Sequence, residues 1–270
     1  MSEPLQLNGN TLHIEKWEKK LPGLTAGFTS RCQGVSSLPF DSWNMGLHVG
    51  DKTADVLENR QRLADKVRMP LESFVAGEQV HGTEIKKIGQ DEKGCGAKRL
   101  DTSLKSIDGV YTKEKGVLCT AFFADCVPLF FLDPVSGLIG IAHAGWRGTV
   151  GRIAEKMVWK LTEYGATKSS LLAVIGPCIS KANYEVDHQV ISNISDKDQA
   201  IAATPLANGR FLLDLKKLNA KILHDAGLPE KNIAVTNYCT FDDETLFFSH
   251  RRDQGKTGRM LAFIGYRDYI

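Results

Sequence analysis

Three short segments of the chain each carry a metal-binding side chain at a turn or at the end of an apolar run. His81 stands in GEQVHGTE, Cys126 in AFFADCVPLF and His143 in GIAHAGWRG. Catalytic zinc sites commonly use three protein ligands, drawn from imidazole, thiolate and carboxylate groups, and leave the fourth position for water or substrate. If the three segments converge, they predict a catalytic metal site made of two imidazoles and one thiolate.

The same residues also fit a plainer interpretation, because sequence spacing does not bring distant loops together. A buried cysteine can be a small core residue, and each histidine can form only local hydrogen bonds. Asp125, which precedes Cys126, has two alternatives as well: it can carry a proton beside the metal, or it can turn away and cap a nearby loop. We expect Cys178, in the apolar segment GPCI, to pack in the core rather than react.

Positive side chains gather near the end of the chain, in the nine-residue run RRDQGKTGR. Arginine suits two-point binding of oxyanions, and the two glycines of the run let backbone N–H groups approach an anion. The alternative is a solvated basic turn. If the run forms one wall of a phosphate site, the predicted phosphate-binding residues are Arg251, Arg252, Lys256 and Arg259.

Two further segments offer candidates for binding phosphate or ribose. Arg147 follows Trp146 just before a helix expected to begin near Thr149, where the helix N-terminus also attracts an anion. Its guanidinium can instead extend over the Trp146 ring. Asn44 and His48, in SWNMGLHVGD, can bind the substrate or satisfy the backbone of their own turn.

These residues must be positioned by regular elements, and the periodicity of apolar residues predicts both helices and strands. Helices are expected over 51–69, from Gly148 to Gly165 and from Asp214 to Gly227. Buried strands are expected in GVLCTAFF, LFFL, LIGIAH, LLAVIG, NIAVT, LFFS and MLAFIG, and a loop around SNISDKDQA. Their interleaving predicts one layered α/β (mixed α+β) domain over 1–270, with a mixed β-sheet core flanked by helices.

Composition restricts the partners and the compartment. The 34 basic and 32 acidic residues leave a formal charge of +2, too small a field to favour nucleic acid or an anionic membrane. No apolar run reaches the length of a membrane span, and MSEPLQLNGN lacks the basic-then-apolar pattern of a secretory leader, so we expect neither a span nor a leader. The six cysteines are scattered without CxxC pairs, which favours reduced thiols in the cytoplasm.

Several of these segments together resemble the YfiH/YlmD family, whose older label is multicopper polyphenol oxidase or laccase-domain protein. The resemblance runs from GFTSRCQGVS and SWNMGLHVGD through VLENRQRL, ADCVPL, HAGWRGT and GPCISKANYEV to SHRRDQGKTGR. It implies a YfiH-like fold and one catalytic zinc ion (Zn2+) per chain, bound by His81, Cys126 and His143. It also implies phosphorolysis of adenosine, inosine and methylthioadenosine, together with deamination of adenosine.

Other functions remain as alternatives. The resemblance also includes proteins described as peptidoglycan-editing factors, so a cysteine-type hydrolase with Cys126 as nucleophile and a histidine base is the second hypothesis. Copper oxidase activity is disfavoured, because several copper centres would consume most of the seven histidines. A closed structural zinc site would need a fourth ligand. The sequence leaves monomer and homodimer both open.

Overall fold

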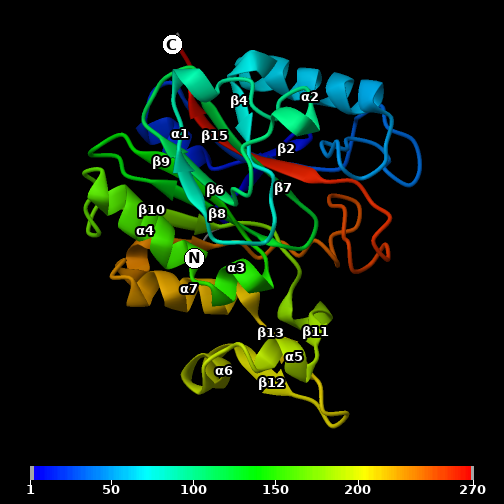
Figure 1. Ribbon diagram of the computed structural model, residues 1–270, viewed down its shortest axis with the longest axis vertical. Helices are drawn as coiled ribbons and strands as arrows, with labels where there is room; N and C mark the ends of the chain where they lie inside the picture. Colours follow the sequence, from blue (N-terminus) through cyan, green and yellow to red (C-terminus); the bar gives the residue numbers. More distant parts are fainter. Residues whose placement is uncertain (1–2, 269–270) are drawn as a thin grey trace.

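Across residues 3–268, which the computed structural model describes, the chain forms two six-stranded sheets and one small sheet (Figure 1). In spatial order, the first sheet contains β1 (Gln6–Asn8), β2 (Thr11–His13), β3 (Leu24–Thr29), β15 (Met260–Tyr266), β7 (Leu118–Phe123) and β4 (Phe74–Ala76). The second contains β14 (Ile233–Val235), β10 (Leu172–Ile175), β8 (Val127–Leu132), β9 (Ile139–Ala144), β6 (Gly109–Thr112) and β5 (Ile85–Lys87). Both sheets combine parallel and antiparallel pairs.

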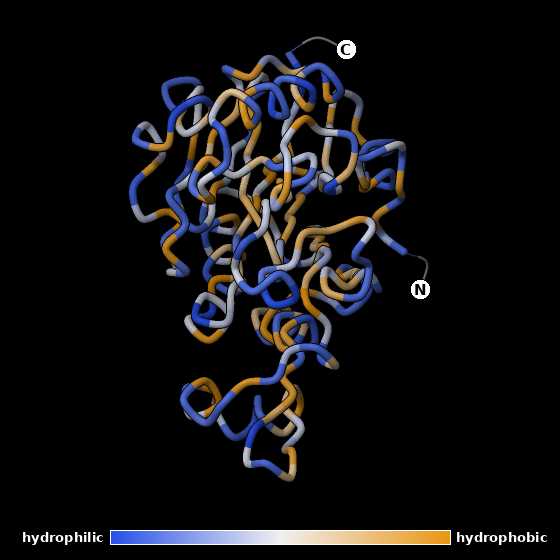
Figure 2. The backbone as a smooth tube through the Cα atoms, turned by 90° about the vertical axis from the view of Figure 1, so that its right-hand side faces the viewer, coloured by the Kyte–Doolittle hydropathy of each residue, from blue (hydrophilic) through white to orange (hydrophobic). Residues whose placement is uncertain are grey.

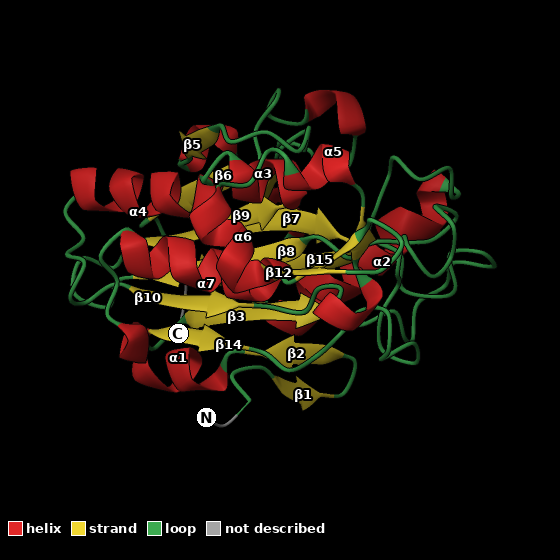
Figure 3. Ribbon diagram, turned by 90° about the horizontal axis from the view of Figure 1, so that it is seen from below, coloured by secondary structure: helices red, strands yellow, loops and turns green. Residues whose placement is uncertain are grey.

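The helices cover the outer faces of the two large sheets and part of the small one. They are α1 (Glu15–Lys20), α2 (Thr53–Val67), α3 (Trp146–Val150), α4 (Ile153–Glu163), α5 (His188–Ile191), α6 (Asp196–Ala202) and α7 (Leu215–Asp225). Short 3-10 turns occupy Leu71–Ser73, Gln90–Glu92, Leu100–Thr102, Lys181–Asn183 and Glu230–Asn232. Seen from below, α4 and α7 lie side by side across the second sheet (Figure 3).

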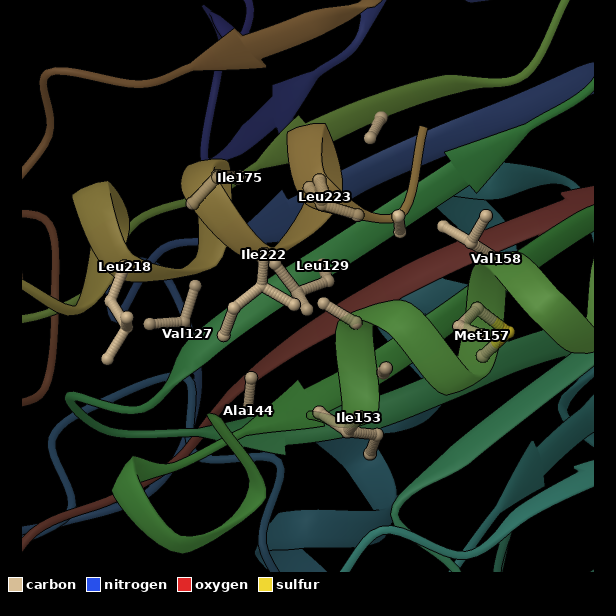
Figure 4. Packing of buried hydrophobic residues seen from close by; sticks show 14 of the residues in the cluster. Val127, Leu129, Ala144, Ile153, Met157, Val158, Ile175, Leu218, Ile222 and Leu223 are labelled. Carbon is tan, nitrogen blue, oxygen red and sulfur yellow. The ribbon is translucent and has the colours of Figure 1, made fainter. Parts of the chain in front are cut away.

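Alternation along β8 explains why the two large sheets pack against each other. Phe130 and Leu132 point into the core shared with the first sheet, whereas Leu129 and Phe131 point to the opposite face. That opposite face packs on Met157 of α4 and on α7 (Figure 4). On the far side of the molecule, α2 covers the outer face of the first sheet. The chain is therefore built in four layers, with apolar segments concentrated in the middle (Figure 2).

The expected α/β class is confirmed, and the core comprises two mixed sheets rather than one. The helix expected over 51–69 is α2, and the one expected from Asp214 is α7, whose N-terminus Asp214 caps by accepting a hydrogen bond from Lys217 N at 2.9 Å. The helix expected after Gly148 starts earlier, at Trp146, and is broken at Arg152, whose φ is +62°. It thus forms two helices, α3 and α4.

Three other sequence expectations differ from the structure. LFFS is not a strand, because Phe247 and Phe248 are buried in an irregular segment beside β15. The polar stretch expected to be a loop contains α6, whose N-terminus is capped by the Ser195 hydroxyl accepting from Asp198 N at 3.2 Å. The fully buried strand β3 was not among the expected strands, although it pairs with both β2 and β15.

The small sheet belongs to a part of the chain that projects from the rest. Its strands are β11 (Glu185–Val186), β13 (Phe211–Leu213) and β12 (Ala203–Pro205), in that order. Together with α5 and α6 they form what we call the lobe, residues 184–213, at the lower end of Figure 1. No helix within 3–268 is long and apolar enough to cross a membrane. A single domain over 1–270 stays a prediction.

Candidate functional site

The three candidate metal ligands meet where the chain passes from the first large sheet to the second. Cys126 immediately precedes β8, and His143 lies in β9, where it pairs with Pro128. His81 comes from the loop after β4, with a φ of +59°. One ligand atom from each residue lies within 4.8 Å of the other two. The structure therefore brings the predicted His–Cys–His group together.

A glycine leaves the space that this group needs. A Cβ atom at Gly145 would lie 2.8 Å from Cδ2 of His81, 3.1 Å from Sγ of Cys126 and 3.8 Å from Cε1 of His143. The rings of the two histidines stand nearly perpendicular, with centroids 4.8 Å apart. Any larger residue at position 145 would displace His81 or Cys126, which accounts for the glycine in HAGW.

A buried aspartate that sequence reasoning missed orients His143. Asp108 Oδ1 accepts a hydrogen bond from His143 Nδ1 at 2.8 Å, and the side chain of Asp108 is fully buried. Because a carboxylate accepts but does not donate, a proton is fixed on Nδ1, and Nε2 is the nitrogen that a metal can take in place of a proton. The same carboxylate accepts from the backbone N–H groups of Val80, His81 and Gly82. Asp108 thus holds two of the three ligands.

The charges of the group are strongly coupled. Burial alone would raise the pKa of the Cys126 thiol, but the positive charge of His143 and hydrogen bonds from both histidines lower it to about 6. Burial lowers the pKa of His143, and the Cys126 thiolate and Asp108 outweigh this and raise it to about 9. The site therefore favours a thiolate, the form in which cysteine binds a metal.

Asp125 anchors neighbouring loops, as in the second of its two alternatives, but it does not turn away from the cavity. Its φ is +84°, and its carboxylate accepts hydrogen bonds from Thr240 Oγ1 at 2.7 Å, Ser249 Oγ at 3.1 Å and the backbone N–H of Arg251 at 2.7 Å. These bonds tie the turn between β7 and β8 to the basic run near the end of the chain. Asp125 lines the cavity next to Cys126, but both of its oxygens are occupied by the fold.

A cavity of about 550 Å³ opens at the His–Cys–His group. From the predicted set its wall contains the three ligands, Asp125, His48, Arg251 and Arg259. Sequence reasoning missed other lining residues, among them Arg60, Ser103, Phe122 and Tyr184. The sequence did contain a signal for Arg60. It lies four residues after Val56 and three before Leu63 in α2, so the helical period places a charged side chain on the buried face of the helix.

At one part of the cavity wall, His48, Arg60 and Arg259 form what we call the cationic group. The Phe122 ring contacts two of them, with Arg60 Cζ 4.7 Å and the His48 ring 6.1 Å from its centroid. A Cβ atom at Gly46 would lie 2.9 Å from Arg259 Cγ and 3.4 Å from His48 Cε1. All three side chains therefore border one space.

The two arginines of the cationic group have no acidic partner among residues 3–268. Arg60 is buried and donates to the carbonyls of Met45, Gly96 and Ala97, and burial lowers its pKa to about 9. Arg259 uses only Nη1, which donates to Thr257 O and Gly258 O. Its Nε and Nη2 hydrogens have no acceptor within the described part of the chain. The only acidic residues on the cavity wall are Asp125 and Glu78, and Lys105 lies 3.8 Å from Glu78.

Four other predicted residues do not line the cavity. Asn44 is buried and satisfies its own turn through Gly46, Asp51 and the backbone N–H of Arg259. Arg147 is exposed in α3, with Cζ 4.7 Å from the centroid of the Trp146 ring, as its alternative described. Arg252 donates to backbone carbonyls of the surrounding turn and to Asp253. Lys256 is exposed.

Arg251 lines the cavity, but its guanidinium is engaged with the lobe. Its Cζ lies 5.3 Å from the centroid of the Tyr184 ring, and Nη1 donates to Glu185 O at 3.0 Å. The basic run is therefore divided. Arg259 lines the cavity near Gly46 and His48, Arg251 supports the lobe, and Arg252 stabilises the turn itself.

Comparison with known proteins places this geometry in a family. The chain is 47% identical over 265 residues to purine nucleoside phosphorylase YlmD of Bacillus subtilis, covering 96% of this chain and 95% of that protein. Among solved structures, YlmD from Geobacillus stearothermophilus superposes with a TM-score of 0.93 at 43% identity, covering 98% of this chain and all of that one. The Bacillus licheniformis hypothetical protein YfiH gives the same TM-score at 41% identity, covering 98% and 99% of the two chains.

A family model extends the match to nearly the whole chain. Residues 25–267 match the model described as multi-copper polyphenol oxidoreductase laccase. The matched segment contains every candidate ligand and every member of the cationic group. The chain therefore belongs to this laccase-like family and is a homologue of YfiH and YlmD.

Proposed function

We propose that this protein is a zinc-dependent purine nucleoside phosphorylase that acts on adenosine, inosine and methylthioadenosine, and that also deaminates adenosine. The name of its relatives supports the phosphorylase activity. The single observation that carries the proposal is the pair of uncompensated guanidinium groups, Arg60 and Arg259, on the wall of the cavity that also holds the His–Cys–His group. An anion and a metal-activated substrate would meet there.

The donor set and its surroundings fit a zinc ion. His81 and His143 supply imidazole nitrogens, Cys126 supplies a thiolate, and Gly145 keeps the space between them open. When bound, zinc supplies a Lewis acid with one open coordination position. Several copper centres do not fit, because residues 3–268 contain one group of three suitable ligands.

Phosphorolysis requires a phosphate oxygen to form a bond to C1′ of the ribose while the C1′–N9 bond breaks. The purine leaves with the bonding electron pair and takes up a proton. In our proposal Arg259 binds the phosphate dianion through its free Nε and Nη2 hydrogens, and the positive charge of Arg60 adds to the attraction. Burial and the charges of Arg259, Arg60 and His143 lower the pKa of His48 to about 4. A neutral His48 can therefore donate one hydrogen bond without adding charge.

Deamination replaces the C6 amino group of adenosine with an oxygen from water and releases ammonia. It uses the same cavity, with the reacting base beside the His–Cys–His group. Asp125 does not serve as the proton carrier in this proposal, because its two oxygens already accept three hydrogen bonds from the fold. Asp108 keeps His143 in the orientation that leaves Nε2 for the ion.

A direct experiment tests both the metal and the reaction. Elemental analysis of the purified protein is expected to give about one zinc and little copper per chain. Adenosine with phosphate is expected to release adenine and ribose 1-phosphate, and omission of phosphate should abolish adenine release while inosine formation continues. Copper in excess with oxidation of phenols, or release of adenine without phosphate, would contradict the proposal.

A metal-free cysteine hydrolase acting on a cell-wall precursor is the second candidate. It is favoured by the position of Cys126 between two histidines on the cavity wall. In this case chelation leaves activity intact and alkylation of Cys126 abolishes it. In the zinc enzyme, chelation removes activity and added zinc restores it.

A further inference from the structure

Tyr184 is the residue through which the lobe reaches the cavity. It stands directly before β11, the first strand of the lobe, and its side chain lines the cavity. The side chain is partly buried and packs against the apolar core that the second large sheet shares with α4 and α7. Figure 1 shows the lobe projecting away from both large sheets, so this contact links a peripheral segment to the candidate active site.

The Tyr184 ring is held in place from two directions. The Arg251 guanidinium covers the ring, with Cζ 5.3 Å from the ring centroid, and Arg251 Nη1 donates to the next carbonyl, that of Glu185, at 3.0 Å. The carbonyl of Tyr184 accepts a hydrogen bond from Leu213 N at 3.0 Å. Arg251 is in turn fixed by its own backbone N–H, which donates to Asp125. The ring is therefore oriented before any ligand arrives.

The hydroxyl of Tyr184, by contrast, has no partner in the protein. Within residues 3–268 no donor or acceptor contacts it, yet it is not among the fully enclosed polar atoms that lack hydrogen bonds. Burial raises the pKa of this phenol well above its usual value, so the hydroxyl keeps its proton. Because Tyr184 lines the cavity, its hydroxyl is accessible there, and a bound ligand can supply the hydrogen-bond partner that the protein does not.

Charge decides which part of the ligand Tyr184 meets. The cationic group occupies the wall near Phe122. Its two arginines bind a dianion more strongly than the neutral hydroxyl of a tyrosine does. Tyr184 contacts Arg251, an arginine already engaged with the lobe, and the apolar Ile179 lines the same cavity. A neutral, polar and partly apolar group suits this second wall.

We propose that Tyr184 is a substrate-recognition residue whose hydroxyl hydrogen-bonds the neutral nucleoside, while the cationic group takes the phosphate. This inference rests on the proposed function and adds to it the residue that sets affinity for the nucleoside. The lobe thereby acts as the support of a specificity-determining side chain, and Arg251 acts as a positioning residue that keeps the ring in place.

The variant Tyr184→Phe tests this, because it removes the hydroxyl and leaves the ring. Loss of one neutral hydrogen bond costs about 0.5–1.5 kcal/mol, so kcat/KM for inosine is expected to fall roughly 2- to 13-fold. The KM for phosphate and the zinc content should stay at wild-type values. The matched control is Tyr238→Phe, whose ring packs on Phe247 at 5.7 Å outside the cavity wall, and it should behave as wild type.

Calorimetric binding of inosine without phosphate gives a second measurement that does not depend on turnover. Weaker inosine binding by Tyr184→Phe, with unchanged phosphate binding, supports the inference. Unchanged inosine binding and kcat/KM in an active enzyme would overturn it, and so would a raised KM for phosphate alone. A wild-type protein that releases no purine would instead refute the proposed function, which separates the two failures.

Discussion

The His–Cys–His group and the cationic group line one cavity but are built in different ways. Two of the three candidate metal ligands, Cys126 and His143, adjoin or belong to the paired strands β8 and β9. The buried Asp108 orients His143 and accepts a hydrogen bond from the backbone N–H of His81. The cationic group draws one residue each from a loop, from α2 and from the segment before β15. The first is fixed by a strand register and a few short contacts, and the second by the packing of distant segments.

This difference decides how readily each group is found. Few residue types bind zinc, so a histidine or cysteine at a strand end is informative by itself. Arginine serves structure as often as binding, and neighbours in one run can differ: Arg252 satisfies carbonyls of its turn, whereas Arg259 retains free donors toward the cavity. The number of unused N–H groups, which only the structure reveals, separates the two roles.

The largest effect is expected for the variant Cys126→Ala, which removes the thiolate ligand. Two imidazoles alone should not retain the ion, so zinc content is expected to fall to near zero and phosphorolysis by at least about 10³-fold. Elemental analysis and the adenine-release assay measure this, and circular dichroism checks that the chain stays folded. Retention of both zinc and activity would show that the ligand assignment is wrong.

The variant Arg259→Met tests the other group. Loss of hydrogen bonds between a charged donor and phosphate costs about 1.5–3 kcal/mol, so the KM for phosphate is expected to rise about 10- to 100-fold. Zinc content should not change, because the ion and the anion have separate protein partners. Arg147→Met is the matched control, since Arg147 covers Trp146 outside the cavity wall. Equal effects of the two variants would remove Arg259 from the anion site.

Asp108 and Asp125 have different roles, because the first orients a candidate metal ligand and the second anchors a turn. Asp108→Asn is expected to weaken zinc binding about 10- to 100-fold, because the amide disturbs the hydrogen bond that orients His143.

Asp125→Asn is expected to lower the free energy of unfolding by about 1–3 kcal/mol, since the carboxylate accepts three hydrogen bonds that join distant segments. Competition with a chelator and chemical denaturation measure the two effects. A larger loss of zinc from the Asp125 variant would reverse the assignment.

The smallest effect concerns the titration of His48, part of whose ring remains exposed. Its pKa in the folded chain is about 4, below the usual 6.5, because of burial and the charges of Arg259, Arg60 and His143. The unfolded chain therefore binds a proton more readily, and this contribution to stability is complete above pH 6.5 and is lost as the pH falls toward 4. Arg259→Met should raise the His48 pKa toward 6.5 in an NMR titration. An unchanged pKa would separate His48 from the cationic group.

Individual elements show how much of the fold could be predicted from the sequence. The α2 and α7 helices follow from apolar periodicity and from the Asp214 cap, because these signals are local. LFFS was mistaken for a strand because apolar content reports burial, and Phe247 and Phe248 are buried without belonging to a sheet. The strand β3 was not predicted because Ala26 and Gly27 interrupt its short run of strand-favouring residues.

The sequence by itself identified the chemistry available to this protein: His81, Cys126 and His143 as candidate metal ligands, and a concentration of arginine near the end of the chain. The fold class followed too, since alternating apolar segments and helical periodicity are local properties. Only the tertiary structure decided that Asp108 orients His143, that Asp125 anchors a turn, and that Arg60 joins Arg259 on the cavity wall. The physical reason is that hydrogen-bond partners and unused donors depend on contacts between segments far apart in the chain, which no local pattern records.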